Sequence, residues 1–385
     1  MRIALPPIVL SIAMGLLLAA CGTPGSTTVS PGTATPTMTA GASSSVATQP
    51  ASANATPIAQ IDPLQAIRMV DVNSGWAFTT KGAVLKTSDG GRHWQDVTPK
   101  TPSPDKSSQS EFLTAQAAWL AWENEPGQPI TIVHTSNGGA SWQTAVINNI
   151  TGELAQDTLR FINPQQGWLA TTRAEGMLHY TNNFYRTMDG GQTWSNVSGP
   201  TRSTSIWGIS FANSQLGWAG LYWPGPTAQV EKTVNGGKSW QQVQLPPPAG
   251  MTEQQIGETE TTAPVLIGAN GLLPAHITMN TKEMQKRLVL YTTHNSGTTW
   301  VAGPLAGFDS NDAYALDTLH VWAEESNSNA LHFSSDGGKT WTQLTQTPQH
   351  FGALSFVDLH NGWAIDDGGH LYRTMDGGMS WQTLS

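Results

Sequence analysis

Carboxylates and aromatic rings are the side chains of this 385-residue chain best suited to proton transfer or to recognition. They gather in short segments such as WENEPGQP at 122–129, YWPGPTAQ at 222–229 and DDGGH at 366–370. Paired carboxylates can act on a glycosidic bond, and an acidic surface edged with aromatic rings can bind a partner. The residues concerned are Trp122, Glu123, Glu125, Glu175, Tyr222, Trp223, Glu324, Glu325, Asp366 and Asp367.

The spacing of these carboxylates favours binding over catalysis. Asp366 and Asp367 are adjacent, and neighbouring residues of an extended strand point to opposite sides. They therefore do not face each other across a glycosidic bond, and we predict no catalytic residues. A second interpretation stays open, in which the loops are acidic because they are solvated and the extra tryptophans pack beneath them.

The composition restricts the kind of partner. A net charge of −9 and a pI near 5.5 argue against a nucleic-acid partner, which needs a basic surface. The chain has one cysteine, and its histidines stand singly in the sequence, so we predict neither a metal site nor a cofactor.

The elements that must position these residues form a repeat. A box such as KTSDGGRHW or RTMDGGMSW occurs seven times, at intervals of 40 to 60 residues. A period of this size indicates one supersecondary unit per repeat. The boxes end at Trp94, Trp142, Trp194, Trp240, Trp300, Trp341 and Trp381.

Each repeat reads as four short antiparallel strands, A to D. An apolar run such as LRFINP at 159 predicts strand A, and a Gly-Trp pair such as that in NGWAIDD at 361 begins strand B. Strand C runs into the box, and strand D begins at its tryptophan. In this arrangement the loops between strands B and C lie on one face of the domain and the boxes on the other.

The box resembles the Asp-box, or BNR repeat, and the Gly-Trp element resembles the photosystem II stability/assembly-factor-like propellers. The resemblance covers residues 61–385. It implies an all-β, seven-bladed β-propeller with four-stranded antiparallel blades and an Asp-box turn between strands C and D of each blade. It also implies a non-catalytic role in binding, as an assembly or stability factor for a membrane complex.

The acceptor position of the box alternates between aspartate and asparagine. Because the two share a side-chain oxygen but differ in charge, we predict a structural turn and not a calcium site. The glycine two positions later supplies a left-handed backbone, and the closing tryptophan is predicted to be the wedge between blades. The acceptors are Asp89, Asn137, Asp189, Asn235, Asn295, Asp336 and Asp376.

A divergent glycoside-active enzyme is the alternative, since sialidases also resemble Asp-box propellers. That family clamps a carboxylate with three arginines and uses a Tyr–Glu pair. The segment AIRMV around Arg68 is a poor match to its first arginine motif. Arg186 and Arg373 occupy the box-flanking position held by Lys86 and Lys232 in other repeats, which indicates a structural role.

The first 57 residues predict export and anchoring. Residues 1–20 read as a signal peptide whose apolar run is too short to span a bilayer, and Leu18-Ala19-Ala20-Cys21 resembles a bacterial lipobox. Residues 21–57 then form the anchor and a flexible Thr/Ser/Pro/Ala/Gly-rich stalk, before a propeller over 58–385. We expect a monomer, lipid-anchored at Cys21 on the outer face of the cell membrane (or the outer membrane, if there is one), that binds a protein or glycan.

Overall fold

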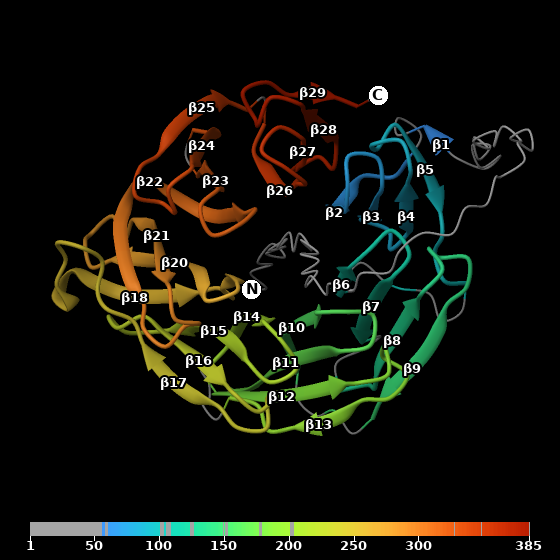
Figure 1. The fold of residues 1–385 in the computed structure, drawn as a ribbon, viewed down its shortest axis with the longest axis horizontal. Coiled ribbons are helices and arrows are strands. Elements are labelled where there is room, and N and C mark those ends of the chain that lie inside the picture. Colours follow the sequence, from blue (N-terminus) through green and yellow to red (C-terminus); the bar gives the residue numbers. More distant parts are fainter. Residues whose placement is uncertain are drawn as a thin grey trace, which may run out of the picture.

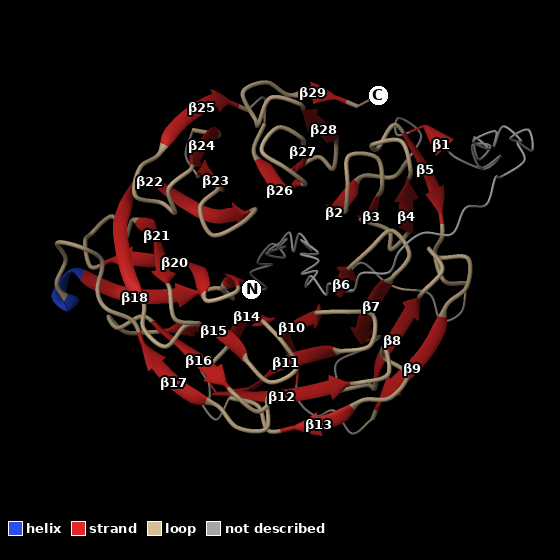
Figure 2. Cartoon of the chain, in the orientation of Figure 1, coloured by secondary structure: helices blue, strands red, loops and turns tan. Residues whose placement is uncertain are grey.

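The computed structural model describes residues 56–57, 61–100, 104, 109–123, 127–148, 150, 153–176, 179–200, 204–326, 328–347 and 349–384. The predicted signal peptide, Cys21 and nearly all of the predicted stalk lie outside these residues. Strands dominate, and the described part contains a single 3₁₀ turn, η2 (Glu253–Gln255) (Figure 2).

Antiparallel blades stand side by side in a ring, and each four-stranded sheet has its first strand nearest the axis and its last strand at the rim (Figure 1). The molecule is therefore an all-β propeller with four-stranded antiparallel blades. Three sheets have four strands each: β6 (Gln109–Phe112), β7 (Ala118–Glu123), β8 (Ile130–Thr135) and β9 (Gln143–Ile147); β10 (Glu153–Phe161), β11 (Gly167–Gly176), β12 (His179–Thr187) and β13 (Ser195–Val197); β26 (Phe351–Phe356), β27 (Gly362–Asp366), β28 (Leu371–Thr374) and β29 (Gln382–Thr383).

The first sheet has a fifth strand at its rim. The two-residue strand β1 (Thr56–Pro57) pairs with β5, so the order is β1-β5-β4-β3-β2. The other strands of this sheet are β2 (Leu64–Met69), β3 (Gly75–Thr79), β4 (Val84–Thr87) and β5 (His93–Asp96).

The remaining strands are hydrogen-bonded into one twelve-stranded sheet. Strand β15 pairs with both β14 and β18, and the long strand β22 pairs first with β21 and then with β23. The strands are β14 (Ile206–Phe211), β15 (Gly217–Trp223), β16 (Gln229–Thr233), β17 (Gln241–Gln244), β18 (Ile256–Thr261), β19 (Val265–Ile267), β20 (Asn270–Met279), β21 (Lys286–Thr293), β22 (Val301–Ala315), β23 (Val321–Glu325), β24 (Ala330–Ser334) and β25 (Thr342–Gln346).

The seven boxes fold into one common turn. The predicted left-handed glycine has a positive φ in all of them, from 66° to 98°. The residue before it is also left-handed, and in one box this residue is Ser296 (φ 54°). Each box turn donates a backbone hydrogen bond of 2.8–3.0 Å to the turn between the first two strands of its own repeat, as Gly90 N does to Asn73 O.

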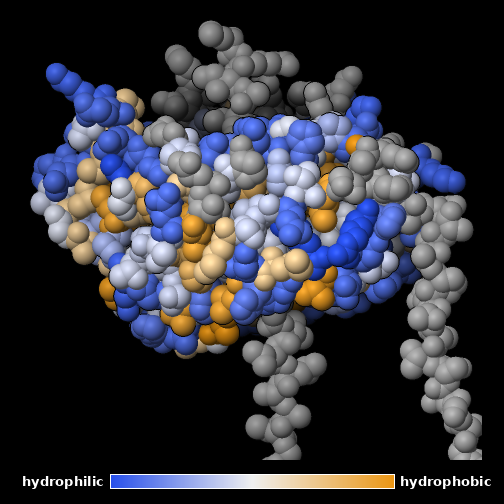
Figure 3. Space-filling model, turned by 90° about the horizontal axis from the view of Figure 1, so that it is seen from above, coloured by the Kyte–Doolittle hydropathy of each residue, from blue (hydrophilic) through white to orange (hydrophobic). Residues whose placement is uncertain are grey.

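These bonds join two sets of turns at the same edge of the ring, which we call the box-turn face. The opposite edge, which carries the loops after β3, β7, β11, β15, β20, β23 and β27, is called the loop face. Seen edge-on, the ring wall shows apolar residues as separate small patches among polar ones (Figure 3).

The acceptor oxygen of the box works as predicted. In every box it accepts a bond of 2.9–3.0 Å from the backbone N–H four residues later. The side chain at that later position is a hydroxyl in six boxes, and it donates to aspartate or accepts from asparagine. Thr193 thus donates to Asp189 at 2.6 Å, whereas Asn137 donates to Ser141 at 2.8 Å.

Contacts between neighbouring blades confirm the predicted place of several box tryptophans, but most of these indoles are not fully buried. Trp94 and Trp300 are buried, but Trp142, Trp194, Trp240, Trp341 and Trp381 are half-buried. Most of the fully buried indoles that join neighbouring blades belong to strand B, and Trp94 of the first box is the exception among the box tryptophans. Trp119 stacks on Phe161 with ring centroids 3.7 Å apart, and its Nε1 donates to Gly190 O at 2.7 Å. The box tryptophans begin the rim strands and pack against the same clusters, so they extend these seams outwards.

A cation covers the outer side of several strand-B indoles. Lys86, Arg186, Lys232 and Arg373 lie 5.0–5.8 Å from the ring centroids of Trp76, Trp168, Trp218 and Trp363. Lys232 Nζ also donates to Ser296 O in the next box turn, at 3.1 Å. These cations therefore have the structural role that their position in the repeat predicts.

The ring closes between the β26–β29 sheet and the β2–β5 part of the first sheet. Trp363 Nε1 donates to Gly90 O at 2.9 Å, and Leu64 N donates to Gly369 O at 3.0 Å. Trp94, Trp363 and their neighbours share one hydrophobic cluster across this seam.

Candidate binding face

The predicted site residues lie where the second strand of a repeat ends on the loop face. Strand β7 ends at Glu123, β15 at Trp223, β23 at Glu325 and β27 at Asp366. Glu125 lies outside the described residues, and so does the side chain of Glu175 on β11. The repeat therefore brings the described members of the set to one face, because every second strand runs towards it.

Four described members of the predicted set, Trp122, Glu123, Glu324 and Asp366, are buried and do not belong to the exposed surface, and the first two of them end strand β7. Trp122 is 1% exposed and packs in a cluster with Phe78 and Leu120. Glu123 is buried as well. The assignment of these four residues to a recognition surface is wrong. The end of β7 is covered on both sides, because Trp122 fills the seam beside the first sheet and Glu123 faces Arg173 on β11.

Glu123 belongs to a buried ionic cluster that sequence reasoning missed. Arg173 Nη1 lies 2.5 Å from Glu123 Oε2, and its Nη2 lies 3.9 Å from Asp157 Oδ1. Burial raises the pKa of Asp157 to about 7, although Arg173 acts in the opposite direction. Arg173 Nε and Asp157 Oδ1 have no hydrogen-bond partner among the residues that the structure describes. The sequence did hold one signal for this cluster. In TTRAEG, a charged residue, Arg173, stands near the end of a strand that the repeat predicts to be buried.

Glu324 anchors the segment that enters the last blade. Its carboxylate accepts bonds from Thr347 Oγ1 at 3.0 Å and from Phe351 N at 2.9 Å. His350 Nε2 lies 3.5 Å from Glu324 Oε2. Burial raises the pKa of Glu324, and His350 opposes that change. The bonds from Thr347 and Phe351 give this carboxylate a structural task.

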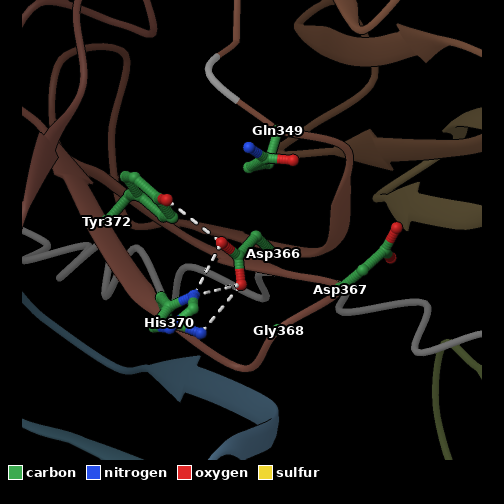
Figure 4. A pocket seen from close by; sticks show the side chains of 6 residues that line it. All are labelled: Gln349, Asp366, Asp367, Gly368, His370 and Tyr372. Carbon is green, nitrogen blue, oxygen red and sulfur yellow. Dashed lines mark hydrogen bonds and ion pairs between the residues drawn. The ribbon is translucent and has the colours of Figure 1, made fainter.

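Asp366 organises the next loop in the same manner. It accepts a bond from His370 N at 2.9 Å and another from Tyr372 Oη at 3.0 Å (Figure 4). Burial opposes ionisation, but the bonds from His370 and Tyr372 outweigh it and hold the pKa of Asp366 below its usual value. These residues line a pocket of about 250 Å³ together with Gln349 and Asp367.

The residues that this part of the face displays are Asp367 and Glu325. The Asp367 side chain is 73% exposed and points away from Asp366, as predicted for adjacent strand residues (Figure 4). His350 Nδ1 lies 3.2 Å from Asp367 Oδ1, and Ser328 Oγ donates to Glu325 at 2.6 Å. The histidines beside these carboxylates, His350 and His370, were not predicted, because a single histidine in a loop carries no local signal.

Tyr222 and Trp223 are half-buried on the same face. Tyr222 Oη donates to Glu258 Oε2 at 2.6 Å. Burial and the Glu258 carboxylate raise the pKa of Tyr222 to about 12, so the phenol stays protonated at neutral pH. This part of the face offers aromatic surface next to a carboxylate.

The arginines that a sialidase-like site needs are engaged elsewhere. Arg160 Nη1 donates to Glu111 at 2.8 Å on the inner strands β10 and β6. Arg68 donates to Tyr314 Oη, which in turn donates to Phe356 O and not to a glutamate. Arg173 is fully buried. These three side chains therefore do not form an open clamp for a substrate carboxylate.

Within the described residues, no group of three or more His, Cys, Asp or Glu side chains is arranged to hold a metal ion. Helices long and apolar enough to cross a bilayer are likewise absent from the part of the chain that the structure describes.

The fold and the face define a β-propeller with an acidic, partly aromatic loop surface. Residues 47–156 match the family model described as photosynthesis system II assembly factor YCF48. A curated relative, the photosystem II assembly lipoprotein Ycf48 of Synechococcus sp. (strain CC9902), is 26% identical over 164 residues. That match covers 40% of this chain and 44% of the relative.

Two solved structures share the fold. The structure titled YCF48 bound to D1 peptide has a TM-score of 0.56 and 17% identity, and the match covers 85% of this chain and 96% of that one. YCF48 from Cyanidioschyzon merolae has a TM-score of 0.54 and 20% identity, with coverage of 83% and 98%. The chain therefore shares the β-propeller fold of these structures, and part of its sequence is similar to Ycf48.

Proposed function

We propose that this chain is a non-catalytic, surface-anchored propeller that binds a protein partner as an assembly or stability factor for a membrane complex. The relatives named as assembly factors support this role, and one of them is described as bound to a peptide. In this proposal the ring has seven blades, with three of them contained in the twelve-stranded sheet.

The contacts on the loop face carry the proposal. The buried carboxylates Glu123, Glu324 and Asp366 are each held by neighbouring segments of the chain. The displayed ones, Glu325 and Asp367, lie at the rim of the face, where charges steer and select a partner more than they perform chemistry. We infer that the partner presents a complementary cationic surface to this rim.

Capture from detergent-solubilised membranes tests the role. We expect the full chain to enrich a specific membrane complex, and the double variant Glu325→Gln, Asp367→Asn to weaken capture by up to about tenfold. Asp96→Asn, an exposed change on the rim strand β5, is the matched control and should leave capture unchanged. Equal capture by the double variant would remove this face from the proposal.

Anchoring through Cys21 is the second part of the proposal. The name of the curated relative, a lipoprotein, supports it together with the lipobox-like sequence. After a high-salt wash of the membranes, Cys21→Ala should be found in the soluble extracytoplasmic fraction, whereas the parent chain should stay on the membrane. A variant that stays on the membrane after a high-salt wash would contradict the anchor.

The alternative, a glycoside-active enzyme, has a direct test. Fluorogenic sialosides and a glycan panel should show no turnover above a heat-inactivated sample. Turnover that is lost in Arg68→Ala or Arg160→Ala would reverse the order of the two proposals.

A further inference from the structure

Large apolar side chains are displayed mainly on the box-turn face. Eleven such side chains are exposed among the described residues, and eight of them lie in box turns or in or directly beside the turns bonded to them, with exposures of 37% to 65%. The other three, Val146, Met284 and Val301, lie elsewhere. The eight are Val72, Met188, Val234, Ile267, Leu319, Leu359, Met375 and Met379.

The repeat places these side chains at one level. Met188, Val234 and Met375 occupy the same position in three boxes, directly before the acceptor residue. Because every box turn has the same backbone and the same bond to its neighbouring turn, equivalent side chains extend equally far from the ring. The result is a flat face with single apolar side chains that protrude from it, which suits a planar partner.

Charge separates the two faces. The box-turn face carries as many cations as carboxylates, so the net charge of −9 is carried by the rest of the chain. Its carboxylates all accept hydrogen bonds from backbone N–H groups of their own turns. The cations are Lys86, Arg92, Arg186, Lys232, Lys238, Lys339 and Arg373, and the carboxylates are Asp71, Asp89, Asp189, Asp317, Asp336, Asp358 and Asp376.

The exposed ends of the box turns carry both cationic and apolar side chains, the two kinds that favour contact with a bilayer surface. The position after the two left-handed residues is Arg92, Lys238 or Lys339 in three boxes and Met379 in the last, all exposed. Cations among protruding apolar residues suit the headgroup region of an anionic membrane, whereas the acidic loop face would be repelled from it.

We propose that the box-turn face lies against the lipid bilayer, with Met188, Val234, Met375 and Met379 inserted among the headgroups. The proposal rests on the surface anchoring proposed above, since acyl chains on Cys21 would hold the ring near the membrane. It deepens that function, because this orientation directs the loop face and its rim carboxylates away from the bilayer, towards the partner.

The single cysteine makes a site-specific test possible. In a Cys21→Ala background, which is unacylated and free of thiols, Met379→Cys and Val301→Cys each accept one polarity-sensitive fluorophore. Both side chains are exposed to a similar extent, at 64% and 63%, but Val301 lies on the rim strand β22. Vesicles made from equal parts of phosphatidylcholine and phosphatidylglycerol should shift the emission of the fluorophore in Met379→Cys to the blue. The emission of the fluorophore in Val301→Cys should stay unchanged.

Vesicle flotation supplies the second readout. Met188→Ser, Met375→Ser and Met379→Ser together should lower partitioning of the unacylated chain at least about tenfold, because less apolar area enters the interface. Val146→Ser with Val301→Ser is the control and should float like the parent. Unchanged thermal unfolding of both variants excludes loss of the fold as the cause.

Several results would overturn the proposal. They are no shift at either labelled site, equal shifts at both, or flotation unaffected by the three serines. A shift caused by solubilised membrane proteins and not by vesicles would assign the face to a protein partner instead. Because the test uses an unacylated chain and pure lipid, it is independent of whether the anchor and partner capture succeed.

Discussion

In each box turn, one side-chain oxygen accepts the backbone N–H four residues later, whether an aspartate or an asparagine supplies it. The hydroxyl at that later position adapts, since it donates to Asp336 and Asp376 and accepts from Asn235 and Asn295. An aspartate in this position makes the stability of the turn depend on pH, whereas an asparagine does not. Burial alone would raise the pKa of Asp189, but bonds from Thr193 and Thr187 outweigh it and lower the pKa to about 2.

Exchange at Asp189 tests the equivalence of the two acceptors. Asp189→Asn should change the free energy of unfolding at neutral pH by less than about 1 kcal/mol, because Thr193 can reverse its hydrogen bond. Asp189→Ala, which leaves the N–H of Thr193 without its acceptor, should cost about 1–3 kcal/mol. Urea unfolding measures both. An asparagine variant as unstable as the alanine variant would show that the charge matters after all.

The pKa of Asp157 is raised, whereas that of Asp189 is lowered, so the two residues make folding stability depend on pH in opposite directions. The folded pKa of Asp157, about 7, lies above the unfolded value, so the folded state binds the extra proton between about pH 4 and 7 and loses stability as the pH rises through that window. His276, whose pKa burial lowers to about 3, gives a slope of the other sign below about pH 6.5. The contribution of Asp157 to the pH dependence of stability must therefore be measured as the difference in unfolding free energy between the parent chain and a variant of Asp157.

Asp157→Asn should isolate this contribution. Relative to the parent chain, the variant should gain stability as the pH rises from 5 to 8, by an amount on the order of 2 kcal/mol, because the amide remains neutral. Unfolding in urea at a series of pH values gives this difference. A gap that is constant with pH would mean that Asp157 stays ionised beside Arg173.

At the scale of the elements, the unit of assembly is the seam between two blades. A strand-B indole stacks on the aromatic ring of the next strand A, as Trp168 does on Phe211 with centroids 3.6 Å apart. The glycine that begins strand B in the blade of the strand-A ring leaves room for that ring, as Gly217 does for Phe211. A Cβ on Gly362 would lie 2.4 Å from Cε1 of Phe356 in its own blade, a distance that packing cannot tolerate.

Gly362→Ala should therefore destabilise the last blade by about 1–3 kcal/mol, because Phe356 must leave its stacked position on Trp322. Gly307→Ala is the control, since nothing lies within 4 Å of a Cβ at that exposed strand position. Thermal unfolding of the two variants should separate them clearly. Similar melting temperatures would show that the ring can shift at little cost.

The elements themselves were predictable from sequence, because their signals are local. The side-chain bonds within a box turn span four residues or fewer, and strands β3, β11, β15 and β27 begin at the predicted Gly-Trp glycine. The seams were not predictable, since Trp119 meets Phe161 only once the ring geometry is fixed. The same holds for the candidate site, where Glu123 and Arg173 lie fifty residues apart in sequence. Local sequence could therefore place the loops on one face but could not tell buried carboxylates from displayed ones.

At the scale of the whole molecule, the ring depends on a seam that no strand crosses in the described residues. The β26–β29 sheet takes its strands from the C-terminal end of the chain, and the β2–β5 blade follows the N-terminal segment. Backbone and side-chain contacts hold the two together, among them Trp363 to Gly90 and Met69 N to Ser355 Oγ at 3.0 Å. At the other seams the chain itself continues from one blade to the next.

Trp363→Leu should reveal this difference. Loss of the indole removes the bond to Gly90 O and the surface beneath Arg373, at a cost of about 2–4 kcal/mol. The loss should act locally first, so amide hydrogen exchange should accelerate in β2 and β26 before the other inner strands. Trp168→Leu, at a seam the chain crosses, should cost a similar free energy without selective exchange at the closure. Equal protection of β2 and β26 in both variants would mean that the ring unfolds as one unit, with its closing seam no weaker than the rest.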